Sequence, residues 1–171
     1  LKIGLRLEKK LGVNPFKFGM IGSTDAHTAM AAVEEENFFG KHSGVEPEPH
    51  RWEHVVISSP KDPDLTVYGW QQASSGYAAV WATENTRAAI FDAMVRKETY
   101  ATTGSRMLVR FFGGWDFTEE DALGRLPGAV GYEKGVPMGG DLKEATAGKK
   151  APTFLVAAMK DPLSGNLDRI Q

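Results

Sequence analysis

The chain has 171 residues, with 42% hydrophobic and 25% charged residues and a formal net charge of −2. This composition is typical of a folded globular protein and excludes global disorder, which requires low hydrophobicity and high net charge. The mildly negative charge argues against a nucleic-acid partner, no apolar run approaches the roughly 20 residues of a membrane span, and the lack of cysteine excludes disulfides and thiolate metal ligands.

The first part of the chain combines a helical pattern, an apolar run and a long polar excursion. Residues 1–12 carry leucine and isoleucine at helical spacing and predict the end of an amphipathic helix. Residues 16–22 are mostly apolar and predict a strand buried on both faces, as parallel strands are. Residues 34–76, with an acidic cluster and several prolines, predict a long loop excursion. Brief strands are predicted inside this excursion at 55–57 and 65–68.

The clearest helix is predicted over residues 85–98, with Thr83 or Asn85 as its cap. A short strand follows at 100–103, and the glycine-rich stretch 119–151 is expected to contain turns. Three more strands are predicted at 106–112, 153–158 and 167–171.

These elements predict an α/β region over residues 1–104 and a β-rich region over residues 105–171. The final residues have the pattern of a strand that is interrupted, and the chain does not begin with methionine. We therefore expect the chain to be an internal or C-terminal piece of a longer protein.

The most specific chemical feature is an Asp-x-His triplet directly after the predicted strand at 16–22. The carboxyl ends of strands are where α/β proteins build their sites. Residues at i and i+2 of an extended chain point to the same side, so Asp25 and His27 can bind one ion together. A carboxylate oxygen with an imidazole nitrogen suits Zn, Mn or Fe. Such a triplet also occurs by chance, and two ligands do not complete a catalytic site.

A second candidate lies in the loop bounded by Gly40 and Gly44, which follows an acidic cluster. Here Lys41 and His42 are candidates to contact an anionic substrate, the alternative being an ordinary solvated loop. The three consecutive glutamates at 34–36 are more typical of the solvent face of a helix than of metal ligands. Two arginines of the next strand pattern, Arg106 and Arg110, would share a face and meet either an anionic ligand or surface carboxylates.

The string Ile21-Gly22-Ser23-Thr24-Asp25-Ala26-His27 resembles the last metal-binding motif of the PHP (polymerase and histidinol phosphatase) superfamily. The wider sequence is similar to one branch of it, the DUF3604 family. The segments that carry this similarity are 14–19, 38–44, 81–87, 97–104 and 166–171.

The resemblance implies the C-terminal portion of a distorted (β/α)7 barrel, followed by a β-rich tail. It also implies a cluster of two or three metal ions and hydrolysis of phosphoester-like bonds, with Asp25 and His27 as metal ligands. Such barrels begin with a His-x-His motif, which is absent here: the other histidines are His42, His50 and His54. The resemblance therefore implies that the site is completed by ligands outside this chain.

Two functions stay open from the sequence. The first is a fragment of a metal-dependent hydrolase of phosphoester-like or related activated esters, which acts on a small anionic substrate and is inactive as the isolated chain. The second is a non-catalytic, β-rich module from about residue 105 that binds a ligand or a partner. In either case we expect the isolated chain to self-associate, because a barrel that is cut open exposes strand edges and an apolar face.

Overall fold

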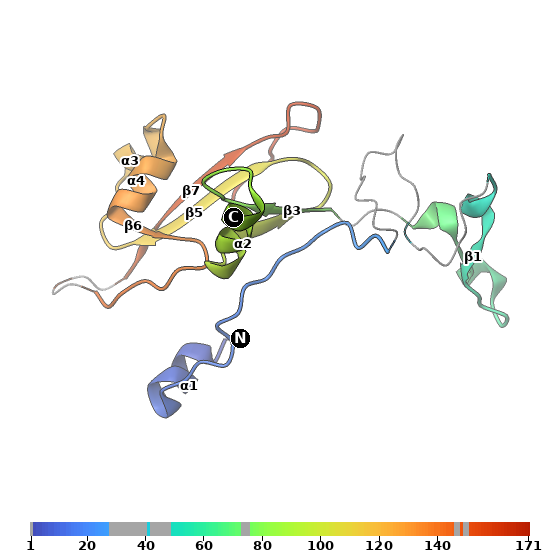
Figure 1. Ribbon diagram of the computed structural model, residues 1–171, viewed down its shortest axis with the longest axis horizontal. Helices are drawn as coiled ribbons and strands as arrows, with labels where there is room; N and C mark the ends of the chain where they lie inside the picture. The colour runs from blue at the N-terminus through green and yellow to red at the C-terminus, as the bar shows by residue number, and fades with distance from the viewer. Residues whose placement is uncertain (1, 28–40, 42–48, 73–75, 146–147, 149–150) are drawn as a thin grey trace. The chain divides into compact units, whose positions relative to one another are not determined.

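A computed structural model describes residues 2–27, 41, 49–72, 76–145, 148 and 151–171 (Figure 1). The chain divides into two compact units. The first comprises Leu1–Ile21, Val80–Tyr100 and Leu108–Met159, and the second comprises Gly22–Ala79, Ala101–Met107 and Lys160–Gln171. In the described part of the chain, helices and three small sheets are mixed, and the strands close no barrel. Within the same residues, no helix has the length and apolar character needed to cross a membrane.

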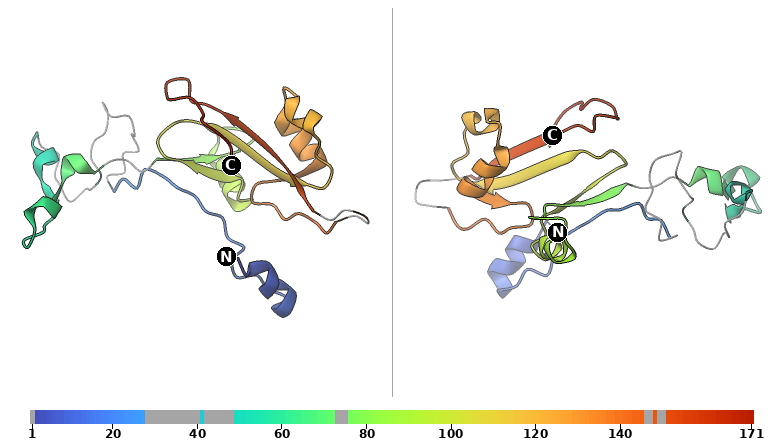
Figure 2. Two further views of the ribbon diagram at one scale, coloured as in Figure 1. Left: turned by 180° about the vertical axis from the view of Figure 1, so that it is seen from behind. Right: turned by 45° about the horizontal axis from the view of Figure 1, so that its top comes forward.

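The first unit is built on a three-stranded antiparallel sheet of order β6-β5-β7. Its strands are β5 (Leu108–Gly114), β6 (Gly135–Pro137) and β7 (Thr153–Met159). β5 and β7 lie side by side in Figure 2 and pair over their whole length, from Leu108 with Met159 to Gly114 with Thr153. The strands predicted at 106–112 and 153–158 are therefore confirmed, with small shifts of their ends.

One face of this sheet holds the core of the first unit. Phe112 and Leu155 are register partners, so their side chains lie on the same face, and both are buried. The helix α4 (Pro127–Lys134) packs on this face. A β-carbon at Gly131 would lie 2.4 Å from the Phe112 ring, so only glycine allows the helix to approach the sheet this closely.

The glycine-rich stretch after β5 contains two helices where the sequence predicted turns. They are α4 and the short α3 (Glu119–Leu123). Thr118 caps α3: its backbone N–H and its hydroxyl both bond the Asp121 carboxylate, at 2.9 and 3.3 Å. The stretch does contain a turn, at residues 138–139, but the prediction did not include the two helices. Gly131 serves close packing of helix on sheet.

Two more helices belong to the first unit. α1 (Gly4–Leu11) confirms the helix predicted over residues 1–12 and ends at Gly12, which has a left-handed φ of 75°. α2 (Arg87–Val95) confirms the helix predicted over residues 85–98. Its cap is Thr86, not the predicted Thr83 or Asn85, because the Thr86 hydroxyl accepts the Ala89 N–H at 3.3 Å.

The short strands form two further sheets. β1 (Val55–Ile57) pairs antiparallel with β2 (Val67–Tyr68) inside the predicted excursion, which confirms the first brief strand and shortens the second. β3 (Tyr77–Val80) pairs with β4 (Thr99–Thr102), close to the strand predicted at 100–103. Three 3₁₀ turns lie near β1 and β2 along the chain, at Arg51–Glu53, Pro63–Leu65 and Gly69–Gln71.

Two predicted strands are absent from the structure. Residues 16–22 are irregular, and Phe18, Met20 and Ile21 are 56%, 70% and 50% exposed rather than buried. Residues 167–171 are irregular as well. Extended backbone needs a neighbouring strand to satisfy its N–H and C=O groups, and no described strand pairs with either segment.

Candidate functional site

The predicted metal ligands Asp25 and His27 lie in a tight turn of the second unit. Asp25 has a left-handed backbone φ of 54°, a conformation that aspartate tolerates better than most residues. The buried Thr24 supports the turn, since its hydroxyl accepts the Ala26 N–H at 3.1 Å. The sequence predicted that the two side chains point to the same side because it assumed an extended backbone. Asp25 does not have an extended backbone, so this assumption is wrong.

Lys41 contacts both of these residues. Its ammonium lies 2.9 Å from Asp25 Oδ2, and its carbonyl oxygen accepts the His27 N–H at 2.6 Å. The Lys41 side chain is 17% exposed and that of Asp25 is 59% exposed. The structure thus brings together a predicted metal ligand and a predicted substrate-contacting residue that are 16 positions apart in the sequence. His42 and the glutamates at 34–36 lie outside the described residues.

The arrangement presents one carboxylate, with a cation already beside it, and an exposed histidine two residues further on. Among the described residues, no three His, Asp or Glu side chains lie close enough together to hold a metal ion. The donor types of Asp25 and His27 fit a transition metal, but their number does not complete a site. The assignment of both residues as metal ligands stays a prediction.

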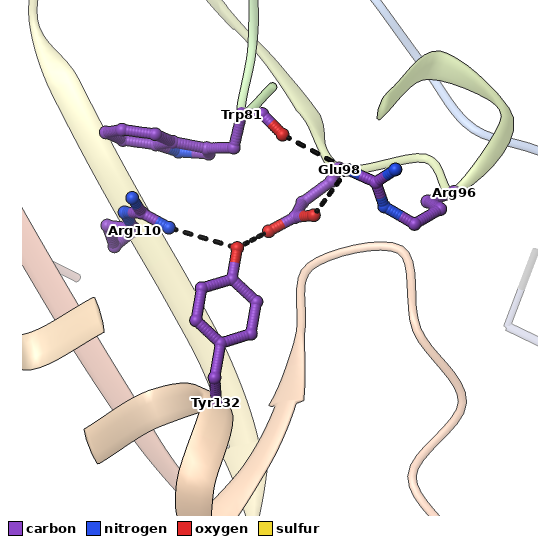
Figure 3. A network of polar contacts seen from close by, with 5 residues as sticks. All are labelled: Trp81, Arg96, Glu98, Arg110 and Tyr132. Atoms are coloured by element: carbon purple, nitrogen blue, oxygen red, sulfur yellow. Dashed lines mark hydrogen bonds and ion pairs between the residues drawn. The ribbon is translucent and has the colours of Figure 1, made fainter. Parts of the chain in front are cut away.

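The first unit contains a second polar cluster, which sequence reasoning missed (Figure 3). Its centre is Glu98, which is 3% exposed and follows α2. The Tyr132 hydroxyl of α4 donates a hydrogen bond to Glu98 Oε1. Arg96 Nη2 lies 3.4 Å from Glu98 Oε2 and 3.4 Å from the Trp81 carbonyl oxygen. A buried carboxylate is stable only with such partners.

Arg110 connects this cluster to an aromatic ring. Its guanidinium carbon lies 3.4 Å from the centroid of the Trp81 ring, and its Nη1 donates to the Tyr132 hydroxyl at 3.1 Å. The Trp81 indole N–H donates to the Val109 carbonyl oxygen at 2.8 Å. Arg110 thus stacks on an aromatic ring, whereas the sequence predicted an anionic ligand or surface carboxylates.

The Tyr132 hydroxyl is electrostatically perturbed. Burial raises its pKa above the ordinary value of 10.0, and the hydrogen bond to Glu98 raises the pKa further. The hydroxyl therefore stays protonated and donates to the carboxylate. Both carboxylate oxygens of Glu98 have partners within the cluster, which joins α4 to the turn after α2. No sequence pattern links residues 98 and 132, because only the fold brings them together.

The chain matches the family model described as "Protein of unknown function (DUF3604)" over residues 1–171, and it therefore belongs to the DUF3604 family. No curated protein and no solved structure matches it. The family assignment confirms the similarity to DUF3604 found in the sequence, and membership of the PHP superfamily stays a prediction. The division at residues 104 and 105 stays a prediction.

Proposed function

We propose that this chain is part of a metal-dependent hydrolase of phosphoester-like or related activated esters, with Asp25 and His27 as two metal ligands. The contact between Asp25 and Lys41 carries the proposal, because it joins a residue predicted to bind metal to one predicted to meet an anionic substrate. The resemblance of residues 21–27 to the last PHP metal motif supports the reaction class and the PHP-like barrel.

The chemistry of the turn supports cation binding. The Asp25 carboxylate is more than half exposed, and its Oδ2 already holds a positive group, the Lys41 ammonium, at 2.9 Å. Carboxylate and imidazole together suit Zn, Mn or Fe. The remaining ligands would come from a longer protein, and the isolated chain would be inactive.

Lys41 would act as an anion-binding residue. A metal ion bound between its ligands would lower the pKa of a bound water and offset charge on the attacked group. A cation bound to Asp25 would compete with Lys41 for that carboxylate, and the Lys41 ammonium beside it would be placed to meet the anionic part of an ester. The bond from the His27 N–H to the Lys41 carbonyl oxygen keeps Lys41 beside the turn in either case.

A second candidate is a non-catalytic binding module, and one observation favours it. The rings of Phe111 and Phe154 stack, with centroids 5.4 Å apart, and both side chains are exposed. By strand alternation they lie on the sheet face opposite Phe112. An exposed aromatic pair on a sheet is typical of a surface that contacts another molecule. The same exposed apolar side chains favour self-association of the isolated chain.

The metal content of the full-length protein tests the proposal. We expect Asp25→Asn and His27→Ala to lower bound Zn, Mn or Fe, and to abolish hydrolysis of bis(p-nitrophenyl) phosphate, because each removes a ligand. Lys41→Met should leave the metal content at or above its original level and lower the rate of hydrolysis. Exposed residues provide matched controls, and Asp168→Asn and His50→Ala should change neither quantity.

If both ligand variants keep their metal and their activity, the metal assignment is wrong. A full-length protein without transition metal and without esterase activity would favour the binding module.

A further inference from the structure

A cavity of about 300 Å³ lies within the first unit, formed by three separate chain segments. Residues 17–20 form one wall, Lys97 and Thr99 form the second, and residues 139–141 form the third. Its volume is at the lower end of the range of small-molecule sites. None of the residues assigned to the proposed metal site lines it.

Lys97 occupies a backbone position that favours glycine. It follows the end of α2 with a left-handed φ of 61°. Its N–H donates to the Met94 carbonyl oxygen at 2.9 Å, and the Glu98 N–H donates to the Ala93 carbonyl oxygen at 3.0 Å. This is the Schellman closure of a helix, in which the left-handed residue is usually glycine because a β-carbon there is strained. A strained non-glycine residue beside a cavity is an indication of function.

Glycines of the other two walls make room for this lysine. A β-carbon at Gly19 would lie 2.9 Å from Lys97 Cγ, and a β-carbon at Gly139 would lie 2.2 Å from the Lys97 carbonyl oxygen. Gly139 itself has a φ of 82°. The walls therefore fit closely around the backbone and the first carbons of Lys97, and the lysine is an integral part of the cavity.

The two lysines of the cavity differ in their charge balance. Lys17 is paired with Glu8 at 2.8 Å and with Asp141 at 3.0 Å, and its hydrogen bond to Glu8 is the main cause of a raised pKa. Within the described residues, the Lys97 ammonium has no ion pair or hydrogen bond. Lys17 and its two carboxylate partners thus offset one another with one negative charge to spare, and the cation of the lining that these carboxylates do not pair is Lys97.

The cavity also has an apolar part. Phe18 and Met20 line it and are largely exposed. Thr99 contributes a hydroxyl, which donates to the Met20 carbonyl oxygen at 3.4 Å. A lysine without an ion pair among the described residues, beside two large apolar side chains, matches a ligand with one anionic group and a small apolar body.

We propose that this cavity binds a small apolar oxyanion, a carboxylate or a phosphate monoester, with Lys97 contacting the anionic group and Phe18 and Met20 contacting the apolar body. The site is independent of the metal site proposed at Asp25 and His27.

Titration of the full chain with phenyl phosphate, benzoate and inorganic phosphate at constant ionic strength, followed by NMR chemical shifts, tests this site. Phenyl phosphate or benzoate should shift the amide signals of residues 17–20, 97–99 and 139–141, and the tighter of the two identifies the anionic group. Inorganic phosphate should bind more weakly, because it lacks the apolar body.

Lys97→Met separates charge from packing, since methionine keeps the carbon stem and the backbone strain. We expect it to weaken binding by about tenfold or more, as for loss of a charge-assisted contact. Lys61→Met, at an exposed position, should have no effect. Lys97→Gly should also lose binding while it keeps the fold, because glycine relieves the strain.

Three results would overturn the proposal. They are the absence of localised shifts with any probe, unchanged binding by Lys97→Met, and binding of inorganic phosphate as tight as that of phenyl phosphate.

Discussion

The run at 16–22 and strand β5 have similar amino-acid compositions and different structures. Both are short and mostly apolar, each with one basic residue (Lys17 and Arg110), and both were predicted to be strands. β5 pairs along its whole length with β7 and partly with β6, and it buries Phe112 under α4. The run at 16–22 has no paired strand among the described residues and exposes most of its large side chains. An apolar run therefore becomes a strand only where another segment offers it a partner and a cover.

Truncation of one phenylalanine in each region should give the largest difference in the free energy of unfolding. Phe112→Ala removes a side chain that is 1% exposed and should lower the free energy of unfolding by about 3–5 kcal/mol. Phe18→Ala removes an exposed side chain and should change it by less than about 0.5 kcal/mol. Urea unfolding followed by circular dichroism measures both. Equal effects would mean that residues 16–22 are buried in solution, and the contrast drawn here would fail.

Loss of the hydrogen bond that attaches α4 to the turn after α2 should have an intermediate effect on the free energy of unfolding. Tyr132→Phe removes the hydroxyl that donates to Glu98 and accepts from Arg110, and it leaves Glu98 Oε1 buried without this donor. We expect a loss of about 1–2 kcal/mol in urea unfolding, the usual range for a buried polar atom that loses its partner. Tyr68→Phe, at an exposed position of the second unit, is the control and should have no measurable effect. No loss for Tyr132→Phe would show that water replaces the hydroxyl.

The smallest expected effect is the pH dependence of the α3–α4 contact. The Lys134 ammonium lies 2.6 Å from Asp121 Oδ1 and lowers the pKa of Asp121 below its ordinary value of 3.8. Because the folded pKa is the lower one, Asp121 stabilises the folded state above about pH 3.8 and loses this contribution as the pH falls through its folded pKa. The pKa of Lys134 is raised above 10.5 by the same bond, so its contribution is present below that pH and is lost as the pH rises through the raised value.

Asp121→Asn tests this pH dependence. Its stability deficit relative to the original chain should be larger at pH 6 than at pH 3, when both are measured by urea unfolding. Asp168→Asn, at an exposed position, should show no such difference between the two pH values. A deficit for Asp121→Asn that stays the same at both pH values would contradict the role of the ion pair.

The elements that the sequence predicts best are those whose signals are local. The helix over residues 1–12 ends where Gly12 allows a left-handed turn, and β5 and β7 follow from runs of strand-forming residues. The helix α4 was missed because its glycines also fit a loop. Gly131 is needed for the approach of the Phe112 ring, and this requirement becomes visible only when helix and sheet are placed together.

The candidate sites follow the same rule. Asp25, His27 and Lys41 were singled out by residue type and by similarity, and the structure adds the ion pair of Asp25 with Lys41, which spacing does not predict. Lys97 escaped attention because a lysine after a helix is ordinary in sequence, and only its left-handed backbone distinguishes it. Asp25 and Lys97 are the two non-glycine residues with positive φ within the described part of the chain, and each lies at a proposed binding position.

The stacking of Arg110 on Trp81 also has a practical use. A guanidinium 3.4 Å from the centre of an indole ring alters the electronic environment of the fluorophore, and Arg110 is held there by Tyr132 of α4. The emission of Trp81 thus depends on whether α4 is in place on the sheet. In a variant that keeps Trp81 as its single tryptophan, this ring would be an intrinsic optical reporter of helix docking, without any attached dye.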